Sequence, residues 1–316
     1  MMHGYLAFGA DGEPLVPFRT WRNTNAAPAA TALSAAFGMS IPLRWSIAHL
    51  HQAVLDGEPH VPRIARLTTL SGYLHGLLTG RDVLGVGDAS GMFPIDPETG
   101  GFDARLMAVY EGLAADAGAA LRLDELLPAV LTAGADAGEL TPEGAALLDP
   151  SGALRPGAPL CPPEGDAGTG MVAANAVRPR TGSVSVGTSV FAMVVLERGL
   201  ARPRAGIDLV TTPAGAPVAM VHGSNGASEL GAWAGLFQEL AVAIGSTAGP
   251  DEVFAAVLGR ALETWDDGIL AYGLLAGEPL LGLAEGRPLV VRAPGSRLSL
   301  AGFARAQLFA VFAALS

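Results

Sequence analysis

The sequence predicts a two-domain α/β protein with a large buried core. The chain has 316 residues, which is long enough for two domains, and half of these residues are hydrophobic. Segments of strand character alternate with segments of helical periodicity along its whole length. Charged residues make up only 16% of the chain, so extensive disorder is excluded.

The first part of the chain predicts strands followed by helices. Residues 4–8 and 14–18 are apolar and flank Ala-Asp-Gly at 10–12, the pattern of two strands joined by a hairpin turn. Helical spacing of apolar residues then predicts helices over 29–38, 46–56 and 63–79. Gly80 stands where a helix of this length is expected to end.

The remaining elements alternate in the same way. Residues 83–96 predict a strand, a turn and a second strand, whereas 149–165 carries five prolines and predicts a loop or crossover. Segment 183–196 is apolar on both faces, which is typical of a central strand or hairpin. We expect further helices over 103–114, 121–134, 226–245, 251–265 and 298–316, and a strand near 288–292. The last helix is apolar to its end, so it predicts either full burial or a covering partner.

Composition excludes several classes of function. A net charge of −11 argues against nucleic acid as a partner, because phosphate backbones require a basic surface. The single cysteine, Cys161, allows no internal disulfide and is typical of a reducing cytoplasm. The N-terminus lacks the basic region and cleavage site of a signal peptide, and no apolar stretch is long enough to span a membrane. We therefore expect a cytoplasmic protein.

Two short segments have residue types suited to phosphate chemistry. In Gly165–Met171, Asp166 lies between small residues at a loop-to-helix junction, where it could approach a ligand and accept a proton from a hydroxyl group. Helix capping by Asp166 is the alternative. In Ser185–Ser189, a Gly-Thr-Ser turn between apolar strands could present N–H groups and hydroxyls to a phosphate, or could be an ordinary hairpin turn. The similar Gly87–Gly91 segment alone indicates a turn.

Several other sites are excluded or disfavoured. The six histidines lack the spacing of a metal site, and neither a Walker A loop nor a Gly-x-Ser-x-Gly elbow is present. The helical stripe of Trp233, Leu236 and Leu240 predicts core packing and not a cofactor site.

The order of the segments resembles the FGGY carbohydrate kinases, the group of xylulose, ribulose and glycerol kinases. Met2-His3-Gly4 is similar to a Met-His-Gly segment of xylulose kinases, and Gly165–Gly168 resembles the loop that carries the catalytic Asp of the family. Val184–Ser189 is similar to the second phosphate loop. Further similar segments are Pro17–Asn23, Leu67–Gly80, Asp88–Gly91 and Gly282–Pro288.

The resemblance implies a fold, a reaction and the residues that carry them. It implies an actin-like, RNase H-like ATPase fold of two α/β domains, residues 1–177 binding sugar and 178–316 binding nucleotide. It also implies transfer of the ATP γ-phosphoryl group to a sugar hydroxyl. The Met-His-Gly segment indicates that the sugar is a ketopentose. Asp166 would be the general base and a Mg²⁺ ligand, and Gly187, Thr188 and Ser189 would hold the ATP phosphates. The sugar pocket would be lined by Met2, His3, Trp21, Arg22 and Asn23.

Departures from the family pattern leave alternatives open. The Asp-x-Gly-Thr loop that the family has near its N-terminus and the late Gly-Gly adenine segment are both absent, so we expect a chain that lacks both ends of the complete fold. Arg44 stands where the family signature has a Lys, and we assign it no role. A fragment or pseudokinase that only binds sugar is the alternative function, and a pure interaction protein is a third. The expected partners are a sugar and, in addition, a second copy of the chain in a homodimer.

Overall fold

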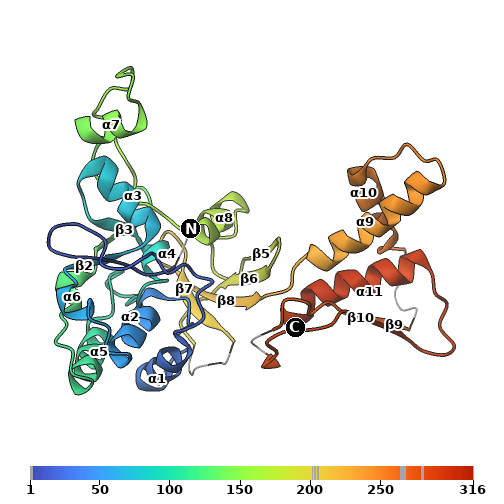
Figure 1. Ribbon diagram of the computed structural model, residues 1–316, viewed down its shortest axis with the longest axis horizontal. Coiled ribbons are helices and arrows are strands. Elements are labelled where there is room, and N and C mark those ends of the chain that lie inside the picture. The colour runs from blue at the N-terminus through green and yellow to red at the C-terminus, as the bar shows by residue number, and fades with distance from the viewer. Residues whose placement is uncertain are drawn as a thin grey trace. The chain divides into compact units, whose positions relative to one another are not determined.

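The chain divides into two compact units in a computed structural model, which describes residues 3–200, 202, 204, 206–263, 268–278 and 281–315. The first unit comprises Met1–Ser183 and Met193–Met220, and the second comprises Val184–Ala192 and Val221–Ser316. Strands and helices occur in both units (Figure 1). The domain boundary predicted after residue 177 stays a prediction, because these units follow contacts alone.

The first unit combines short strands with helices of very different length. Strand β1 (Leu6–Phe8) pairs antiparallel with β2 (Arg66–Thr68), and β3 (Val83–Gly85) pairs parallel with β4 (Ala129–Leu131). The helices are α1 (Ala27–Phe37), α2 (Ser46–Leu55), α3 (Leu70–Thr79), α4 (Val86–Ala89), α5 (Ala104–Asp116), α6 (Leu123–Leu126), α7 (Pro142–Leu148) and α8 (Asp166–Ala173), with a 3-10 turn at Val61–Arg63.

Helix α2 lies in the centre of the first unit. Every residue from Ser46 to Val54 is buried, including His49 and His51, so this helix contacts protein on all sides. Helix α1 packs against α2 and α5, beginning with Pro28 in its first turn and ending at Gly38 in the left-handed conformation (Figure 1). Trp45, directly before α2, is fully buried as well. The core of the unit is therefore built around α2.

Helix α3 begins later than its periodicity predicts. The helix predicted over 63–79 starts at Leu70, because Thr69 is extended and its side-chain oxygen accepts a hydrogen bond from the Gly72 N–H at 3.2 Å. The residues before Thr69 form β2, whose leucine at position 67 faces Ala7 of β1. The predicted C-terminus at Gly80 is confirmed by its left-handed conformation, with φ of 70°.

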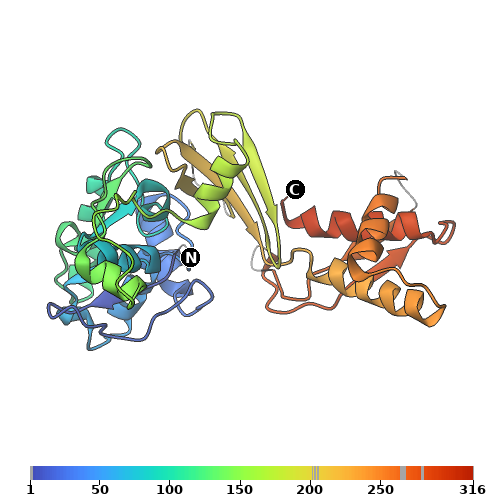
Figure 2. The ribbon, with the colours of Figure 1, turned by 90° about the horizontal axis from the view of Figure 1, so that it is seen from above.

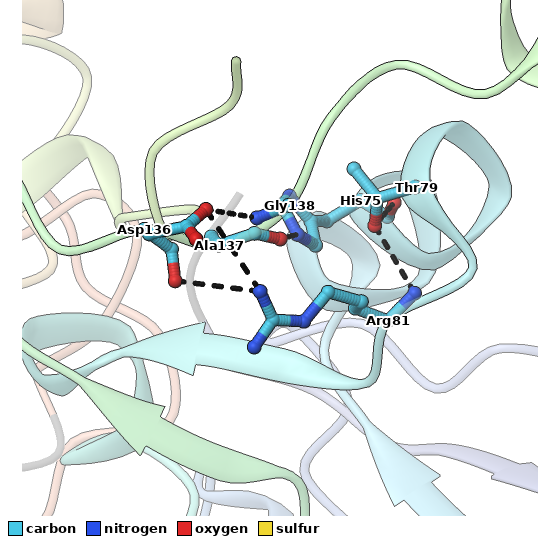
Figure 3. A network of polar contacts seen from close by, with 6 residues as sticks. All are labelled: His75, Thr79, Arg81, Asp136, Ala137 and Gly138. Carbon is cyan, nitrogen blue, oxygen red and sulfur yellow. Dashed lines mark hydrogen bonds and ion pairs between the residues drawn. The ribbon is translucent and has the colours of Figure 1, made fainter. Parts of the chain in front are cut away.

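A polar network fastens the end of α3 to the loop before α7 (Figure 3). The His75 ring nitrogen Nε2 lies 3.0 Å from the carbonyl oxygen of Ala137, and the Arg81 N–H donates to Thr79 Oγ1 at 3.1 Å. Asp136 accepts a hydrogen bond from the Gly138 N–H at 2.8 Å. The same segment holds Leu160 of the crossover loop, because the Ala137 N–H donates to the Leu160 carbonyl oxygen at 3.1 Å and the Leu160 N–H donates to that of Gly138 at 2.8 Å.

Other predicted elements of the first unit are wrong in extent. Residues 14–18 form one isolated bridge, between Pro14 and Phe8, and no strand. Only the first of the two strands predicted in 83–96 exists, because α4 follows it at once. The helix predicted over 121–134 is reduced to α6, and β4 occupies residues 129–131, where pairing with β3 overrides helical propensity. Helix α7 was not predicted, whereas α8 begins at the loop-to-helix junction that was expected at Asp166.

A four-stranded sheet has the strand order β5-β6-β8-β7. Its strands are β5 (Gly182–Val186), β6 (Val190–Val195), β7 (Asp208–Thr211) and β8 (Pro217–Gly223). Strands β5 and β6 are neighbours joined by a three-residue turn, which confirms the prediction of a central strand or hairpin in 183–196. Strand β7 pairs antiparallel with β8, with Asp208 opposite Met220.

The second unit is mainly helical. Helices α9 (Ser228–Ala243), α10 (Pro250–Arg260) and α11 (Leu300–Phe312) pack on one another (Figure 2), with a 3-10 turn at Ala313–Leu315. Helix α11 also packs on the antiparallel pair β9 (Ile269–Tyr272) and β10 (Leu289–Arg292). The helices share a core of Leu230, Val257, Ala261 and Ala304.

Helix α9 only partly meets expectation. The ring of Trp233 packs edge-on against Phe303 of α11, with ring centroids 4.8 Å apart, as a core residue does. Leu236 and Leu240 are instead 51% and 58% exposed, so the predicted core stripe is wrong for these two residues. Within the described part of the chain, none of the helices combines the length and the apolar character needed to cross a membrane.

Candidate active site

Asp166 is the first residue of α8. The preceding Gly165 is extended, with φ of −73° and ψ of 152°, and it ends the proline-rich loop where the helix begins. Gly165 is the N-cap residue, so Asp166 is the first residue inside the helix, and Asp166 is exposed. A carboxylate in this place is favoured by the positive end of the helix. The alternative that Asp166 serves only as an N-cap is therefore disfavoured, and its carboxylate is accessible to a ligand.

One partly buried and one fully buried carboxyl group, those of Glu164 and Asp88, lie beside the Asp166 loop. Glu164 accepts hydrogen bonds from the N–H groups of Gly87 at 3.2 Å and Asp88 at 3.0 Å. Burial raises the pKa of Glu164 to about 7, and the charge of Asp88 adds to that shift. Asp88 is itself fully buried, and burial raises its pKa to about 6, with a smaller contribution from the charge of Asp166. The charge of Asp166 thus acts on Asp88, and the charge of Asp88 acts on Glu164.

Asp88 is held by hydroxyl groups from the start of α3. Its Oδ2 atom accepts hydrogen bonds from Thr69 Oγ1 at 2.7 Å and from Ser71. The other oxygen, Oδ1, is buried without a hydrogen-bond partner. Thr69 therefore both caps α3 and binds this carboxylate, which connects the helix to the 87–91 segment.

The 87–91 segment also contacts the N-terminal strand region. The His3 ring nitrogen Nδ1 lies 3.3 Å from the carbonyl oxygen of Gly91. Ser90 Oγ accepts a hydrogen bond from the Thr211 N–H at 3.1 Å, which ties the segment to β7. One short stretch of chain therefore lies next to both His3 and the loop that carries Asp166, although the sequence alone indicated a simple turn there.

Three other predicted sugar-site residues follow Arg19 in the sequence, and Arg19 forms an isolated bridge with Tyr5. The Arg22 guanidinium lies over the Trp21 ring, 5.0 Å from its centroid. The side-chain oxygen of Asn23 accepts a hydrogen bond from the Asn25 N–H at 3.0 Å, which makes a local turn. Met2 lies outside the described residues. No contact joins Trp21, Arg22 or Asn23 to Asp166 within the described parts, so their pocket roles stay predictions.

Arg44 has a structural partner in the first unit. Its guanidinium forms an ion pair with Asp208 of β7, and its carbonyl oxygen accepts a hydrogen bond from Gly4 N–H at 3.3 Å. Ser40 Oγ also donates to Asp208, at 3.3 Å. Arg44 therefore supports the segment that carries His3.

In the second unit, residues 187–189 form the turn between β5 and β6. The carbonyl oxygens of Gly187 and Thr188 accept hydrogen bonds from the N–H groups of Ala227 and Gly226, both at 2.8 Å. The Thr188 side chain belongs to an exposed residue. Because α9 begins at Ser228, the N-terminus of a 16-residue helix lies next to this turn. An exposed hydroxyl and a helix N-terminus together suit an anionic group such as a phosphate.

Side-chain bonds hold the segment that packs on this turn. Asn225 Nδ2 donates to the Gly277 carbonyl oxygen at 2.6 Å, and Asn225 Oδ1 accepts from the Ala276 N–H at 2.9 Å. Buried Glu278 accepts a hydrogen bond from the Ser224 N–H at 2.9 Å. Sequence reasoning missed these residues, as it missed Glu164 and Thr69. The Asn-Gly pair at 225–226 between a strand and a helix was the available signal.

The structure offers no protein-only metal site in the residues it describes, since no group of three or more His, Cys, Asp or Glu side chains has suitable positions. Mg²⁺ in phosphoryl-transfer enzymes requires only one or two carboxylates, because phosphate oxygens and water complete its shell. The exposed carboxylate of Asp166 fits that requirement.

Comparison with known proteins gives three findings. The sequence profile of the C-terminal domain of the FGGY family of carbohydrate kinases matches residues 182–316. No curated protein matches the sequence significantly. The structure is similar over its whole length to solved kinases. Their sequence identities to this chain are 20% or lower, so the similarity concerns the fold alone.

Three of these kinases align with 99% or 100% of this chain. A xylulose kinase from Rhodospirillum rubrum has a TM-score of 0.72 at 20% identity, covering 100% of this chain and 61% of its own. A ligand-bound xylulose kinase from Lactobacillus acidophilus has a TM-score of 0.74 at 17% identity, with the same coverage. A gluconate kinase from Lactobacillus acidophilus has a TM-score of 0.75 at 17% identity, covering 99% and 61%. The fold is therefore the actin-like α/β fold predicted from the sequence, and the chain spans 61% of the length of these proteins.

Proposed function

We propose that the protein transfers the γ-phosphoryl group of ATP to a sugar hydroxyl. The support is the match of residues 182–316 to the C-terminal domain of the FGGY family of carbohydrate kinases and the fold that the chain shares with solved kinases. The observation that carries this proposal is the exposed carboxylate of Asp166 at the start of α8. It lies near a segment that also contacts His3, so a base and a hydroxyl-binding residue share one unit.

In the proposed reaction, Asp166 accepts the proton of the attacking sugar hydroxyl. The turn formed by Gly187, Thr188 and Ser189 binds the ATP phosphates through N–H and hydroxyl donors, next to the N-terminus of α9. Mg²⁺, when bound, neutralises charge on the phosphates, and Asp166 is the carboxylate that would hold it.

The proposed sugar is a ketopentose, bound by Met2, His3, Trp21, Arg22 and Asn23. The support is the Met-His-Gly sequence and the xylulose kinases among the similar structures. The aromatic face of Trp21 suits sugar C–H groups, while imidazole and amide groups suit hydroxyls. We also propose a cytoplasmic location, supported by the lone Cys161, and a homodimer, which light scattering of the purified protein would check.

Sugar binding without phosphoryl transfer is the second candidate. It is favoured by the fact that His3 and Asp166 both lie in the first unit, whereas the Gly187–Ser189 turn lies in the second. A panel of ketopentoses, aldonates and polyols, assayed with coupled ADP detection and in parallel by calorimetry, separates the two candidates. Sugar-dependent ADP release supports the kinase. Sugar binding with no ADP release supports the second candidate.

A further inference from the structure

The loop before Asp166 is attached to the start of α4 by three hydrogen bonds. The Gly85 N–H donates to the Pro163 carbonyl oxygen at 2.8 Å. The two carboxyl oxygens of Glu164 accept hydrogen bonds from the N–H groups of Gly87 at 3.2 Å and Asp88 at 3.0 Å. These are N–H groups of the first turn of a helix, which have no partner within the helix itself. Glu164 therefore caps α4 from a position 77 residues away in sequence.

The two glycines of this turn make room for the Glu164 side chain. A Cβ atom added at Gly85 would lie 2.3 Å from Glu164 Oε1, and one added at Gly87 would lie 2.4 Å from Oε2. Neither glycine has a positive φ, so the backbone would accept alanine at both positions, and the nearest atoms that an added Cβ would meet belong to Glu164. The site is thus shaped to hold this side chain.

Glu164 is placed here against an electrostatic cost. Its side chain is only partly exposed, and its Oε2 atom accepts a hydrogen bond from the N–H of Asp88, whose own carboxyl group is fully buried. Buried carboxyl groups near one another are unfavourable unless hydrogen bonds compensate. A polar loop residue exposed to water could end the crossover loop without this cost, so the arrangement points to a role beyond loop closure.

We propose that Glu164 is a positioning residue, which fixes the main chain of Asp166 relative to the 87–91 segment through its bonds to Gly87 and Asp88. We call these two bonds the Glu164 latch. The same segment contacts His3 through the Gly91 carbonyl oxygen, so the latch sets the distance from the base to the sugar-binding region. This inference rests on the proposed function in one respect, namely that Asp166 is the base.

The first test is a double-mutant cycle between Glu164 and Gly87. Glu164→Ala removes the latch, and Gly87→Ala displaces the Glu164 carboxyl group with its new methyl group. Each single variant should lower kcat 10- to 100-fold, with KM for ATP and sugar changed less than threefold, because the base is misplaced while both substrates still bind. In the double variant the methyl group has space, so kcat should equal that of Glu164→Ala alone.

Glu164→Gln supplies the conservative comparison. The amide oxygen of glutamine can accept a hydrogen bond from only one of the two N–H groups, so kcat should fall between the values for wild type and Glu164→Ala. Glu143→Gln, an exposed glutamate in the first turn of α7, is the matched control and should behave as wild type. If Glu164→Ala lowers thermal stability but leaves kcat per folded molecule unchanged, or if the two single effects add in the double variant, the proposal is overturned.

Hydrogen exchange on the same full chain gives a second readout that needs no activity. Glu164→Ala should speed exchange at the Gly87 and Asp88 amides and across 164–170 by at least tenfold, with the second unit unchanged. Should wild type phosphorylate none of the sugars, the proposed function fails, and exchange alone decides the latch. Faster local exchange would then support it, and unchanged exchange would overturn it.

Discussion

At the residue scale, the turn formed by residues 187–189 depends on the absence of a side chain at Gly226. A Cβ atom there would lie 2.2 Å from the Gly187 carbonyl oxygen and 2.6 Å from that of Ser189. Both are backbone atoms, so neither can move aside without shifting the turn. Gly226 is therefore expected to tolerate no larger residue if residues 187–189 bind ATP.

We predict that Gly226→Ala weakens ATP binding at least tenfold, because the turn must move away from α9. Gly235→Ala, within the following helix α9, is the control, since nothing lies within 4 Å of its added methyl group. That substitution should stabilise the protein by up to about 1 kcal/mol. Calorimetry with ATP and thermal unfolding of both variants would check this. Equal ATP affinity in the two variants would contradict the proposed phosphate site.

Thr188→Val tests the hydroxyl group of the same turn. Loss of a hydrogen bond to a charged phosphate costs about 1.5–3 kcal/mol, so the KM for ATP should rise roughly 10- to 100-fold. The KM for sugar should change much less, because Thr188 lies in the second unit and His3 in the first. Steady-state kinetics in both substrates measures this. An unchanged KM for ATP would remove Thr188 from the site.

Residue positions differ in how far sequence could predict them. Asp166 and Thr188 stand out because their neighbours in sequence are small residues at junctions between elements, a local signal. Glu164, Thr69 and Asn225 carry no such signal, since their partners lie 77, 19 and 52 residues away. Their contacts exist only after the chain has folded, so pattern reasoning could not find them.

At the scale of elements, the start of α3 couples a helix cap to the candidate site. Thr69 caps α3 and donates to buried Asp88 at 2.7 Å. Thr141 similarly caps α7, accepting from the Gly144 N–H at 3.0 Å, but its hydroxyl donates to a neutral carbonyl oxygen. Comparing Thr69 with Thr141 therefore separates the stability gained from helix capping from the stability gained from a hydrogen bond to a carboxylate.

We predict that Thr69→Ala lowers the free energy of unfolding by roughly 2–4 kcal/mol, the sum of a cap and a hydrogen bond to a charged group. Thr141→Ala should cost about 1 kcal/mol, as an ordinary cap does. Denaturant unfolding of both variants would measure the difference. If the two variants lose the same stability, the Asp88 contact contributes nothing and its place in the site becomes doubtful.

Element prediction succeeded where local signals agreed with tertiary contacts. Helices α1, α2, α5, α9 and α10 follow their periodicity, and α3 ends at the expected glycine. It failed at β2 and β4, which are three residues long and exist because β1 and β3 pair with them. Strands this short bury too little surface to leave a pattern in sequence, and their neighbours then extend the helical signal over them.

At the scale of the whole molecule, buried histidines determine part of the acid stability. His49 is fully buried in α2, and burial lowers its pKa from 6.5 to about 4. In the unfolded chain it takes up a proton below pH 6.5, whereas in the folded protein it stays neutral until about pH 4. Its contribution to stability is therefore complete above pH 6.5 and is lost as the pH falls toward 4. The pKa values of Asp88 and Glu164 are raised, so their contribution to stability instead increases as the pH falls from 7 to 4.

We predict that His49→Leu gains about 2 kcal/mol of stability relative to wild type when the pH is lowered from 8 to 5, because leucine removes the proton uptake of the unfolded state. Urea unfolding of both proteins at the two pH values gives this difference directly, and the carboxyl groups cancel from it. A pH-independent difference between the two proteins would show that His49 does not titrate on unfolding in this range.

The central claim is that the Asp166 carboxylate is the base in phosphoryl transfer to a sugar. The most direct measurement is sugar-dependent ADP release by Asp166→Asn beside Asp251→Asn, which changes an exposed first-turn aspartate of α10 in the same way. We expect Asp166→Asn to lose activity about 10²- to 10⁴-fold while sugar binding and folding persist, and Asp251→Asn to stay active. Near-normal turnover by Asp166→Asn would contradict the claim.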